Sequence, residues 1–238
     1  DLSVWIVTGD GDSMSIGGNH FIHVLRRNFD LNILLFNNQV YGLTKGQYSP
    51  TSEIGRISNS TPFGSVDYPF NPPLLALGAG GTFIARSIDR EQKHLQDILH
   101  KAYKHKGTSL VEVYQNCWVF NDGAFASLTD REIKMETQLV LEHKKPMVFG
   151  KNQDKGLTLK GSKLEVITLN KKNSINEVMI HDEKNKIQGL LLSELTYNKN
   201  FPTPIGVIYR EEKPTYENML YNQLDKAMEA RGKGDLDK

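Results

Sequence analysis

The sequence predicts an α/β protein with a doubly wound, mostly parallel sheet and a small β-rich C-terminal extension. Short apolar runs alternate with amphipathic stretches of helical period through the first half of the chain, as they do in parallel-sheet proteins. A segment of helix length separates the first two apolar runs, which predicts a parallel βαβ unit. From about Glu142 onward, Lys, Asn and Glu become frequent and the apolar pieces become short. We therefore expect an α/β domain over residues 1–149 and an extension over residues 150–238.

The βαβ unit occupies the start of the chain. Residues 2–8 form a β-branched, nearly continuous apolar run, which predicts a strand buried on both faces. Residues 19–28 carry apolar side chains on one helical face and contain Arg26-Arg27 near their end, where positive charge suits a helix C-terminus. Residues 31–36 form the second apolar run. Together these segments place one helix between two neighbouring parallel strands.

The alternation continues after one long loop. Residues 39–70 are polar, with several aromatic side chains and modest charge, which favours an ordered loop with a functional role. The elements expected after this loop are a helix at 71–78, a strand at 82–86, a helix at 89–105, a strand at 109–114, short strands at 157–159 and 164–168, and a helix at 218–231.

Composition excludes several classes of protein. The chain has 29 Lys and Arg against 28 Asp and Glu, and the resulting net charge of +1 offers no basic footprint to a nucleic acid. No run approaches the roughly 18 apolar residues that a membrane span requires. The single cysteine, Cys117, excludes an internal disulfide and a metal site made only of this chain's cysteines. The chain starts at Asp1, without a Met or a signal-like segment, and continues directly into an apolar strand. This start is expected of a sequence that begins in the middle of a fold.

The turn at residues 9–12, Gly-Asp-Gly-Asp, matches none of the common short motifs. An EF-hand loop starting at Asp10 would need Gly at Ser15 and Glu at Phe21. The dinucleotide-binding fingerprint would need Gly in place of Met14, and no P-loop pattern occurs anywhere in the chain. The turn therefore belongs to none of these three kinds of site.

Asp10 and Asn38 form a pair with a clear chemical meaning. Each follows the end of a strand in the same predicted βαβ unit, at the edge of the sheet where α/β proteins bind ligands. A carboxylate and an amide oxygen are the hard ligands that Mg²⁺ prefers, and a diphosphate can supply further oxygens. Gly9 and Gly11 would let the backbone approach a phosphate closely. A structural turn alone would explain Gly-Asp-Gly but does not require the second oxygen ligand, so the pair predicts a magnesium–diphosphate site.

Longer blocks of sequence around this pair carry a resemblance to a known family. G-D-G followed, after a helix and a strand, by N-N resembles the pattern of thiamine diphosphate enzymes. The blocks GDGDSMSIGGNHFIHVLRRN, LLFNNQVYGLTKGQYSPTSE, PFNP and VEVYQNCWVFNDGA resemble the β subunits of 2-oxoglutarate (2-oxoacid):ferredoxin oxidoreductases. The resemblance runs from the first residue to at least Phe149, and the block PTPIGVIYREEKPTYE near the end shares it. It implies that the sheet is of the thiamine diphosphate-binding type.

The resemblance also implies roles for individual residues. Asp10 and Asn38 would bind Mg²⁺ through their side chains and Val40 through its carbonyl. Lys45 would contact CoA or the substrate as a catalytic residue, and Cys117 would be one of four cysteine ligands to a 4Fe–4S cluster. The residues expected to line the diphosphate, in addition to the three magnesium ligands, are Gly9, Gly11, Asp12, Gly42 and Leu43. In the family the other three cluster cysteines lie N-terminal to the G-D-G motif, so we expect this sequence to be a fragment of a longer subunit.

The activity that the resemblance implies is the oxidative decarboxylation of 2-oxoglutarate to succinyl-CoA, with electrons passed to ferredoxin. The chain would be the β subunit of this cytoplasmic enzyme and would be inactive without the α subunit. Two alternatives stay open: pyruvate or another 2-oxoacid as substrate, or a non-catalytic module that binds thiamine diphosphate or assists assembly.

Taken without the resemblance, the individual residues have simpler interpretations. A lone cysteine such as Cys117 is more often an inert buried thiol, and Lys45 is an ordinary solvated loop lysine. His20 and His23 lie on one helical face but have no evident third ligand. The basic stretch at residues 100–106 lies at a helix C-terminus, where a solvated face is expected and a ferredoxin-docking role is a second hypothesis.

Overall fold

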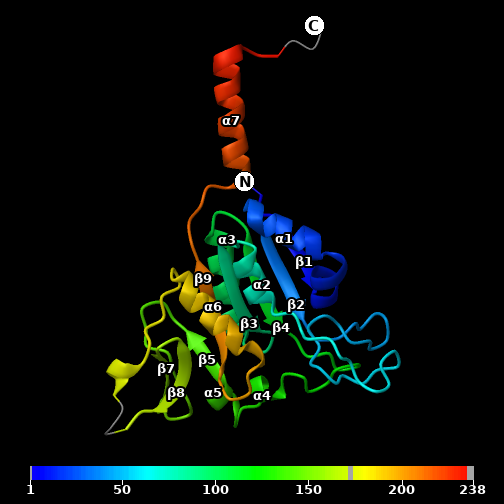
Figure 1. Cartoon of the computed structure of the whole chain (residues 1–238), viewed down its shortest axis with the longest axis vertical. Helices are drawn as coiled ribbons and strands as arrows, with labels where there is room; N and C mark the ends of the chain where they lie inside the picture. The colour runs from blue at the N-terminus through cyan, green and yellow to red at the C-terminus, as the bar shows by residue number, and fades with distance from the viewer. Residues whose placement is uncertain (1, 171–173, 235–238) are drawn as a thin grey trace.

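A six-stranded sheet forms the centre of the protein in the computed structural model, which describes residues 2–170 and 174–234 (Figure 1). Its strands lie in the order β1-β2-β4-β3-β9-β5. Their bounds are Trp5–Gly9 (β1), Asn32–Asn37 (β2), Ser109–Tyr114 (β4), Phe83–Ile88 (β3), Thr203–Arg210 (β9) and Gln138–Leu141 (β5). β1, β2, β4 and β3 are mutually parallel, β9 runs antiparallel to β3, and β5 is parallel to β9. The predicted mostly parallel sheet is confirmed.

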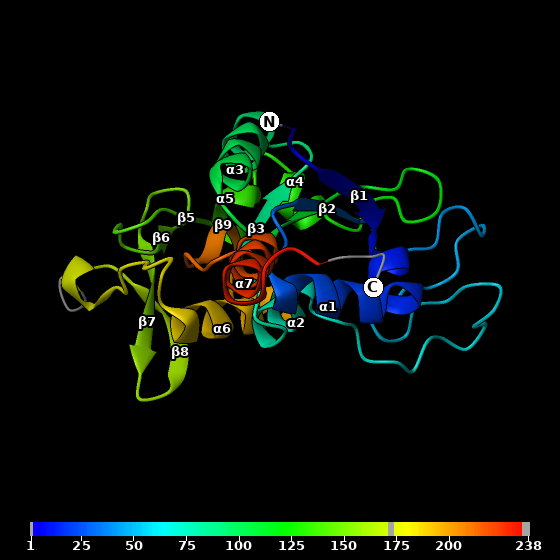
Figure 2. The same ribbon diagram turned by 90° about the horizontal axis from the view of Figure 1, so that it is seen from above.

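Helices cover both faces of this sheet (Figure 2). On one face lie α1 (Gly18–Arg27), α2 (Pro72–Gly78) and α6 (Lys186–Glu194), and on the other lies α3 (Gln92–Lys104). The strand residues alternate between these layers, as the pleat requires. Ile33 and Leu35 pack in the core beneath α1 and α2, whereas Val111 and Val113 pack with Ile98 in the core beneath α3. The doubly wound arrangement that the sequence predicts is therefore present.

The residues after 150 contribute to two sheets. A small antiparallel sheet consists of β6 (Val148–Phe149), β7 (Lys155–Lys160) and β8 (Lys163–Thr168). β9, in contrast, lies inside the large sheet between β3 and β5. The expected boundary between residues 149 and 150 thus passes between two paired strands, and whether either segment folds independently stays a prediction.

One expectation about the first strand is wrong. β1 was expected to be buried on both faces, but Ile6 is 41% exposed and Val7 is 64% exposed. Among the described strands, β1 lies at the edge of the sheet and pairs only with β2, which leaves these two side chains accessible to solvent. An apolar run therefore identified the strand correctly but not its place at the edge of the sheet.

Shorter helical segments complete the described residues. A π-helical turn at Asp12–Ile16 leads from β1 into α1, and α4 (Ala126–Thr129) and α5 (Lys134–Thr137) precede β5. Short 3₁₀ turns lie at Ile175–Glu177 and Leu195–Tyr197. The last helix, α7 (Tyr216–Arg231), projects away from the body of the molecule (Figure 1). Among the described residues, no helix is long and apolar enough to cross a membrane.

Candidate functional site

Asp10 and Asn38 lie side by side at the carboxyl ends of β1 and β2. The two strands are parallel neighbours, with Gly9 opposite Phe36, so the residues that follow them meet at one edge of the sheet. The backbone N–H of Asn38 donates to Asp10 Oδ1 at 3.4 Å. The structure thus brings together the two residues that the sequence predicts as magnesium ligands, although their roles stay predictions.

The Asp10 carboxylate is buried without a positively charged partner. It is 1% exposed, and its Oδ2 accepts hydrogen bonds from Ser49 Oγ at 2.5 Å and Thr51 Oγ1 at 2.6 Å. Burial raises the pKa of the Asp10 carboxyl above its ordinary value, and these hydrogen bonds oppose the rise. Among the described residues, Asp10 forms no ion pair. A bound cation would supply the missing charge and offset the cost of burying the carboxylate.

The glycines around the pair serve different purposes. A Cβ atom added at Gly9 or Gly42 would meet nothing within 4 Å, so open space lies beside both. A Cβ at Gly11 would lie 2.2 Å from Cε1 of Tyr41, whose hydroxyl donates to the Gly11 carbonyl at 3.2 Å. Gly11 therefore permits the approach of the Tyr41 ring, while Gly9 and Gly42 leave room for a ligand.

The other predicted lining residues lie on the loop after β2 and on the turn after β1. Val40 is buried, and its N–H donates to Asn38 Oδ1 at 3.2 Å. Leu43 and Asp12 are exposed. Lys45 is also exposed and adopts a positive φ of 70° in the turn where its amide donates to the Gly42 carbonyl. These exposed positions are available to a ligand or to another chain.

The segment that carries Cys117 docks against the same loop. The side-chain Nδ2 of Asn121 donates to the Asn38 carbonyl at 2.9 Å, and its backbone N–H donates to the Cys117 carbonyl at 3.0 Å. Arg56 also donates to the Phe120 carbonyl, at 2.5 Å. Cys117 is half-buried, and no group of three or more His, Cys, Asp or Glu residues that could hold a metal occurs in the described part of the chain. Cys117 therefore lies on a segment that contacts Asn38, and it is the single cysteine of this sequence.

Sequence reasoning missed the polar residues that support Asp10. Ser49 and Thr51 come from the long loop at 39–70, where no periodic pattern marks them. Arg86 and Glu112 form an ion pair at 2.7 Å with both side chains fully buried. A signal for this pair was present, because each is a charged residue inside an otherwise apolar strand.

The sequence resembles several known proteins. Residues 1–113 match the thiamine pyrophosphate enzyme, C-terminal TPP binding domain family. The chain is 45% identical over 236 residues to 2-oxoglutarate oxidoreductase subunit KorB of Mycobacterium tuberculosis, covering 98% of this chain and 63% of that protein. It is 46% identical over 121 residues to the 2-oxoacid:ferredoxin oxidoreductase subunit beta of Saccharolobus solfataricus, covering 51% and 40% respectively.

The chain is thus similar in sequence to subunits of 2-oxoglutarate and 2-oxoacid oxidoreductases. A solved structure of 2-oxoglutarate:ferredoxin oxidoreductase from Magnetococcus marinus, with 2-oxoglutarate, coenzyme A and succinyl-CoA bound, resembles it with a TM-score of 0.68 and 27% identity. The match covers 99% of this chain and 64% of that chain. The resemblance to these β subunits is thus confirmed, and the chain spans less than two thirds of the length of the relatives named here.

Proposed function

We propose that this chain is the thiamine diphosphate-binding part of a CoA-acylating 2-oxoacid:ferredoxin oxidoreductase. The favoured reaction is the oxidative decarboxylation of 2-oxoglutarate to succinyl-CoA, with electrons passed to ferredoxin. The observation that carries the proposal is the Asp10 carboxylate, which is buried beside Asn38 without an ion-pair partner among the described residues, at the sheet edge where a diphosphate would bind. The names of the M. tuberculosis relative and the M. marinus structure support 2-oxoglutarate as the substrate.

The residues at this edge fit magnesium and thiamine diphosphate. Asp10 and Asn38 would hold Mg²⁺ through side-chain oxygens, with the Val40 carbonyl as a third protein ligand. Open space beside Gly9 and Gly42 leaves room for the diphosphate, which Gly11, Asp12 and Leu43 would also line. When bound, the cofactor supplies a nucleophilic carbon and an electron sink for the decarboxylation. The contribution of this chain is to hold and orient the diphosphate end.

The remaining proposals concern an iron–sulfur cluster, the contact with CoA or the substrate, and the partner proteins. We propose Cys117 as one ligand of a 4Fe–4S cluster. The described residues provide one thiolate, which does not make a four-cysteine site, so the other ligands would come from elsewhere and no step is assigned to the cluster here. Lys45, exposed on its turn, is proposed to contact CoA or the substrate. The α subunit and ferredoxin are the proposed partners, and the cytoplasm is the proposed location.

The test uses the full-length β subunit co-expressed anaerobically with its α partner. Wild-type complex should bind Mg²⁺ and thiamine diphosphate, and should reduce ferredoxin or viologen only when 2-oxoglutarate and CoA are both present. Asp10→Asn should abolish Mg²⁺-dependent cofactor binding, because the amide removes the charge while keeping the shape. Asp97→Asn, on the exposed surface of α3, is the matched control and should bind normally.

Each outcome distinguishes the alternatives. Faster reduction with pyruvate than with 2-oxoglutarate would change the assigned substrate. Cofactor binding without turnover in a fully loaded complex would support the non-catalytic module instead. Wild-type affinity in Asp10→Asn would refute the proposed magnesium ligand.

A further inference from the structure

A continuous chain of buried polar contacts starts at the Asp10 carboxylate. Thr51 Oγ1 lies 2.6 Å from Asp10 Oδ2 and 2.9 Å from Asn37 Oδ1. Asn37 Nδ2 donates to Glu112 Oε1 at 2.8 Å, and Glu112 Oε2 accepts from Arg86 Nε at 2.7 Å. Thr51, Asn37, Glu112 and Arg86 are all fully buried. The contacts therefore join the carboxyl ends of β1 and β2 to the interiors of β4 and β3.

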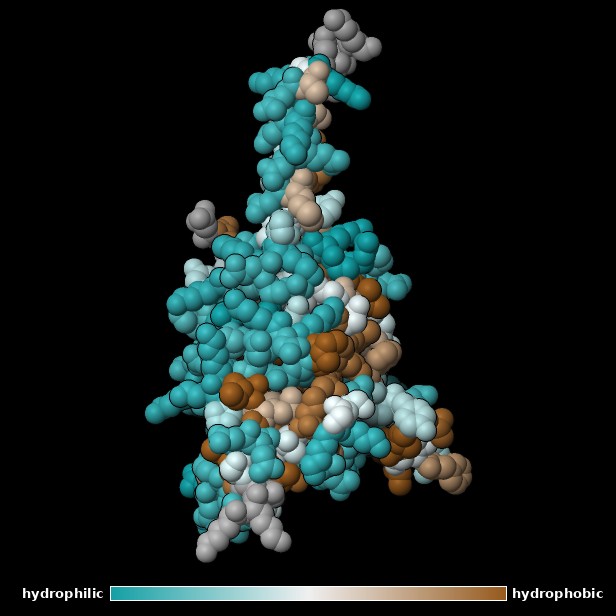
Figure 3. All heavy atoms as spheres, turned by 60° about the vertical axis from the view of Figure 1, so that its left-hand side comes forward, coloured by the Kyte–Doolittle hydropathy of each residue, from teal (hydrophilic) through white to brown (hydrophobic). Residues whose placement is uncertain are grey.

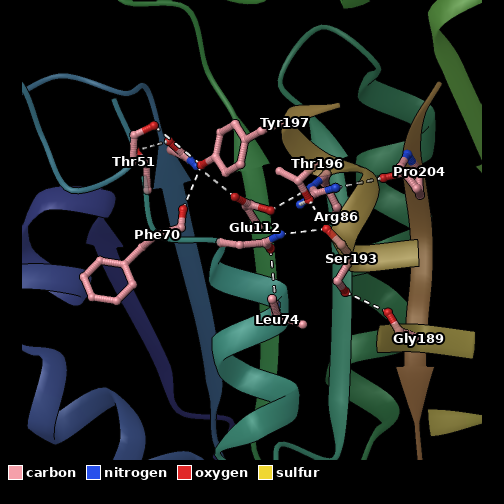
Figure 4. Close-up of polar contacts among 12 residues, drawn as sticks. Thr51, Phe70, Leu74, Arg86, Glu112, Gly189, Ser193, Thr196, Tyr197 and Pro204 are labelled. Carbon is pink, nitrogen blue, oxygen red and sulfur yellow. Dashed lines mark hydrogen bonds and ion pairs between the residues drawn. The ribbon is translucent and has the colours of Figure 1, made fainter. Parts of the chain in front are cut away.

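The far end of this chain lies in the C-terminal part of the protein. Arg86 Nη2 donates to Thr196 Oγ1 at 2.9 Å and Nη1 donates to the Pro204 carbonyl at 3.3 Å (Figure 4). The Tyr114 ring lies 5.0 Å from the Arg86 guanidinium carbon. Arg86 is thus held by β4, by β9 and by the turn before β9, which restricts it to one orientation.

The Arg86–Glu112 pair determines which way the Asn37 amide points. An ionised carboxylate only accepts hydrogen bonds, so the Asn37 NH₂ group must face Glu112 and its carbonyl must face Thr51. The same carbonyl accepts from the Gln39 N–H at 3.2 Å. Rotation of the amide would place donors against the Gln39 N–H and an acceptor against the carboxylate. Thr51 Oγ1 lies between Asn37 Oδ1 and Asp10 Oδ2 and donates its single proton to one of them at a time, so the orientation of the Asn37 carbonyl determines how the Thr51 hydroxyl is shared with Asp10.

A gain in folding stability does not by itself explain the buried Arg86–Glu112 ion pair. Removing two charges from water costs several kcal/mol, and well-packed apolar residues of similar volume often replace a buried pair with no loss of stability. Every buried side-chain nitrogen and oxygen of these four residues has a hydrogen-bond partner in the described structure. A fully satisfied buried network is rigid, which is what a carboxylate needs if its direction matters.

We infer that Arg86 and Glu112 are positioning residues, which act through Asn37 and Thr51 to hold the Asp10 carboxylate in the orientation that binds a divalent cation. This inference rests on the proposed function, because the cation is the magnesium of that site. It also gives the C-terminal part a role, since Thr196 and Pro204 hold the far end of the network. Partners that orient metal ligands in this way typically change metal affinity by about 10- to 100-fold when they are removed.

The test measures cation binding rather than turnover. Full-length β subunit in complex with its α partner is saturated with thiamine diphosphate and titrated with Mg²⁺ by calorimetry. Glu112→Gln keeps the shape but offers a single acceptor oxygen, so either Arg86 Nε–H or the Asn37 NH₂ faces another donor. We expect it to weaken Mg²⁺ binding by about 10- to 100-fold. With Mn²⁺ as the probe, its electron paramagnetic resonance spectrum at saturation should also differ from wild type.

Thr82→Val is the matched control. Thr82 is as buried as Glu112 and donates to Asn28 Oδ1 at 2.6 Å, but it lies at the opposite, amino end of the same sheet. This variant should lose stability yet bind Mg²⁺ like wild type. If Glu112→Gln does not fold, Thr196→Val removes only one outer partner of Arg86 and should weaken Mg²⁺ binding less, in the same direction.

Three results would overturn the inference. Wild-type Mg²⁺ affinity and an unchanged Mn²⁺ spectrum in Glu112→Gln would show that the pair does not position Asp10. An equal loss of affinity in Thr82→Val would show that general destabilisation explains the effect. A wild-type complex that binds no Mg²⁺ would overturn the proposed function and this inference with it, whereas the first two results would overturn the inference alone.

Discussion

At the residue scale, His105 is half-buried, and one positive charge, Arg210, and two negative charges, Asp30 and Glu212, act on its imidazole. Burial lowers its pKa from 6.5 to about 4, and Arg210 adds to the effect. At pH 5 the native imidazole is therefore neutral, while the unfolded chain binds a proton there. Stability is fully present above the unfolded pKa and is lost as the pH falls from about 6.5 toward about 4. Allowing for partial exposure, we expect His105 to account for about 1 kcal/mol of lost unfolding free energy between pH 7 and pH 5.

His105→Gln tests this expectation, because glutamine does not titrate and can still bond Thr82 Oγ1, which lies 2.9 Å from His105 Nε2. Urea unfolding at pH 7 and pH 5 should show a smaller acid-induced loss in the variant than in wild type. His94 and His181 also have lowered pKa values and contribute to both proteins equally. His23→Gln, at an exposed position, should leave the wild-type loss unchanged. An equal loss in His105→Gln and wild type would contradict the assignment.

The site could be predicted from the sequence only where chain order implies proximity. Asp10 and Asn38 follow strands of one βαβ unit, so their meeting at the sheet edge was predictable, and the structure places them in contact. Ser49 and Thr51 reach Asp10 from an irregular loop whose path no local pattern encodes. Glu112 lies on a strand whose sequence shows a buried charge but does not show which residue neutralises it.

At the element scale, α7 has little to hold it in place. Its contacts with the body are near its start, where the Tyr216 and Phe29 rings lie 4.9 Å apart and the Tyr216 amide donates to the Asn28 carbonyl. Every described residue from 218 to 234 is exposed, and Figure 3 shows the helix standing clear of the body, mostly hydrophilic with hydrophobic side chains along one edge. An isolated helix of this length is only marginally stable in water.

We therefore expect the backbone amides of residues 220–231 to exchange with solvent almost as fast as unprotected ones in this chain. The amides of β3 and β4, in the centre of the sheet, should stay protected under the same conditions. Hydrogen–deuterium exchange with mass spectrometry measures both regions together. Ending the chain at Asn218 should change the free energy of unfolding by no more than about 0.5 kcal/mol. Protection in α7 equal to that of β4 would contradict the expectation.

The same scale shows why β9, which like β5 and β6 was not predicted, is hard to recognise from the sequence. β9 contains Pro204 and Gly206, residues that argue against a central strand. Gly206 adopts a φ of 125° opposite Arg86, Pro204 lies beyond the residues that pair with β3, and the register between β3 and β9 shifts between Ile84 and Ala85. Its partners β5 and β3 lie between 65 and 127 residues earlier in the chain, as the pairs Gln138↔Thr203 and Phe83↔Arg210 show, and no local pattern predicts such pairings. The elements of the first βαβ unit were predictable because their neighbours are close in sequence.

At the scale of the whole molecule, the large sheet includes a strand, β9, from near the C-terminal end of the chain. β9 pairs with β3 through Phe83↔Arg210, Ile84↔Tyr209, Ala85↔Val207 and Arg86↔Gly206, and it also pairs with β5. The main core contains Leu192 of α6 and Ile208 of β9 together with residues of α1 and α2. The sheet and the helices on one of its faces therefore need segments from both sides of position 150.

This topology makes the predicted division at 149/150 testable. A fragment of residues 1–149 would lose β9, expose the unpaired edge of β3, and leave the buried Arg86 without its Thr196 and Pro204 acceptors. An unpaired apolar strand edge favours aggregation, and unsatisfied buried donors cost about 1–3 kcal/mol each. We expect this fragment to show no cooperative thermal unfolding and to elute as aggregate in size-exclusion chromatography. A fragment of residues 1–218, which keeps β9, is the control and should unfold cooperatively. A monomeric, cooperatively unfolding 1–149 fragment would instead show that the first domain folds alone, with β9 added to a sheet that does not depend on it.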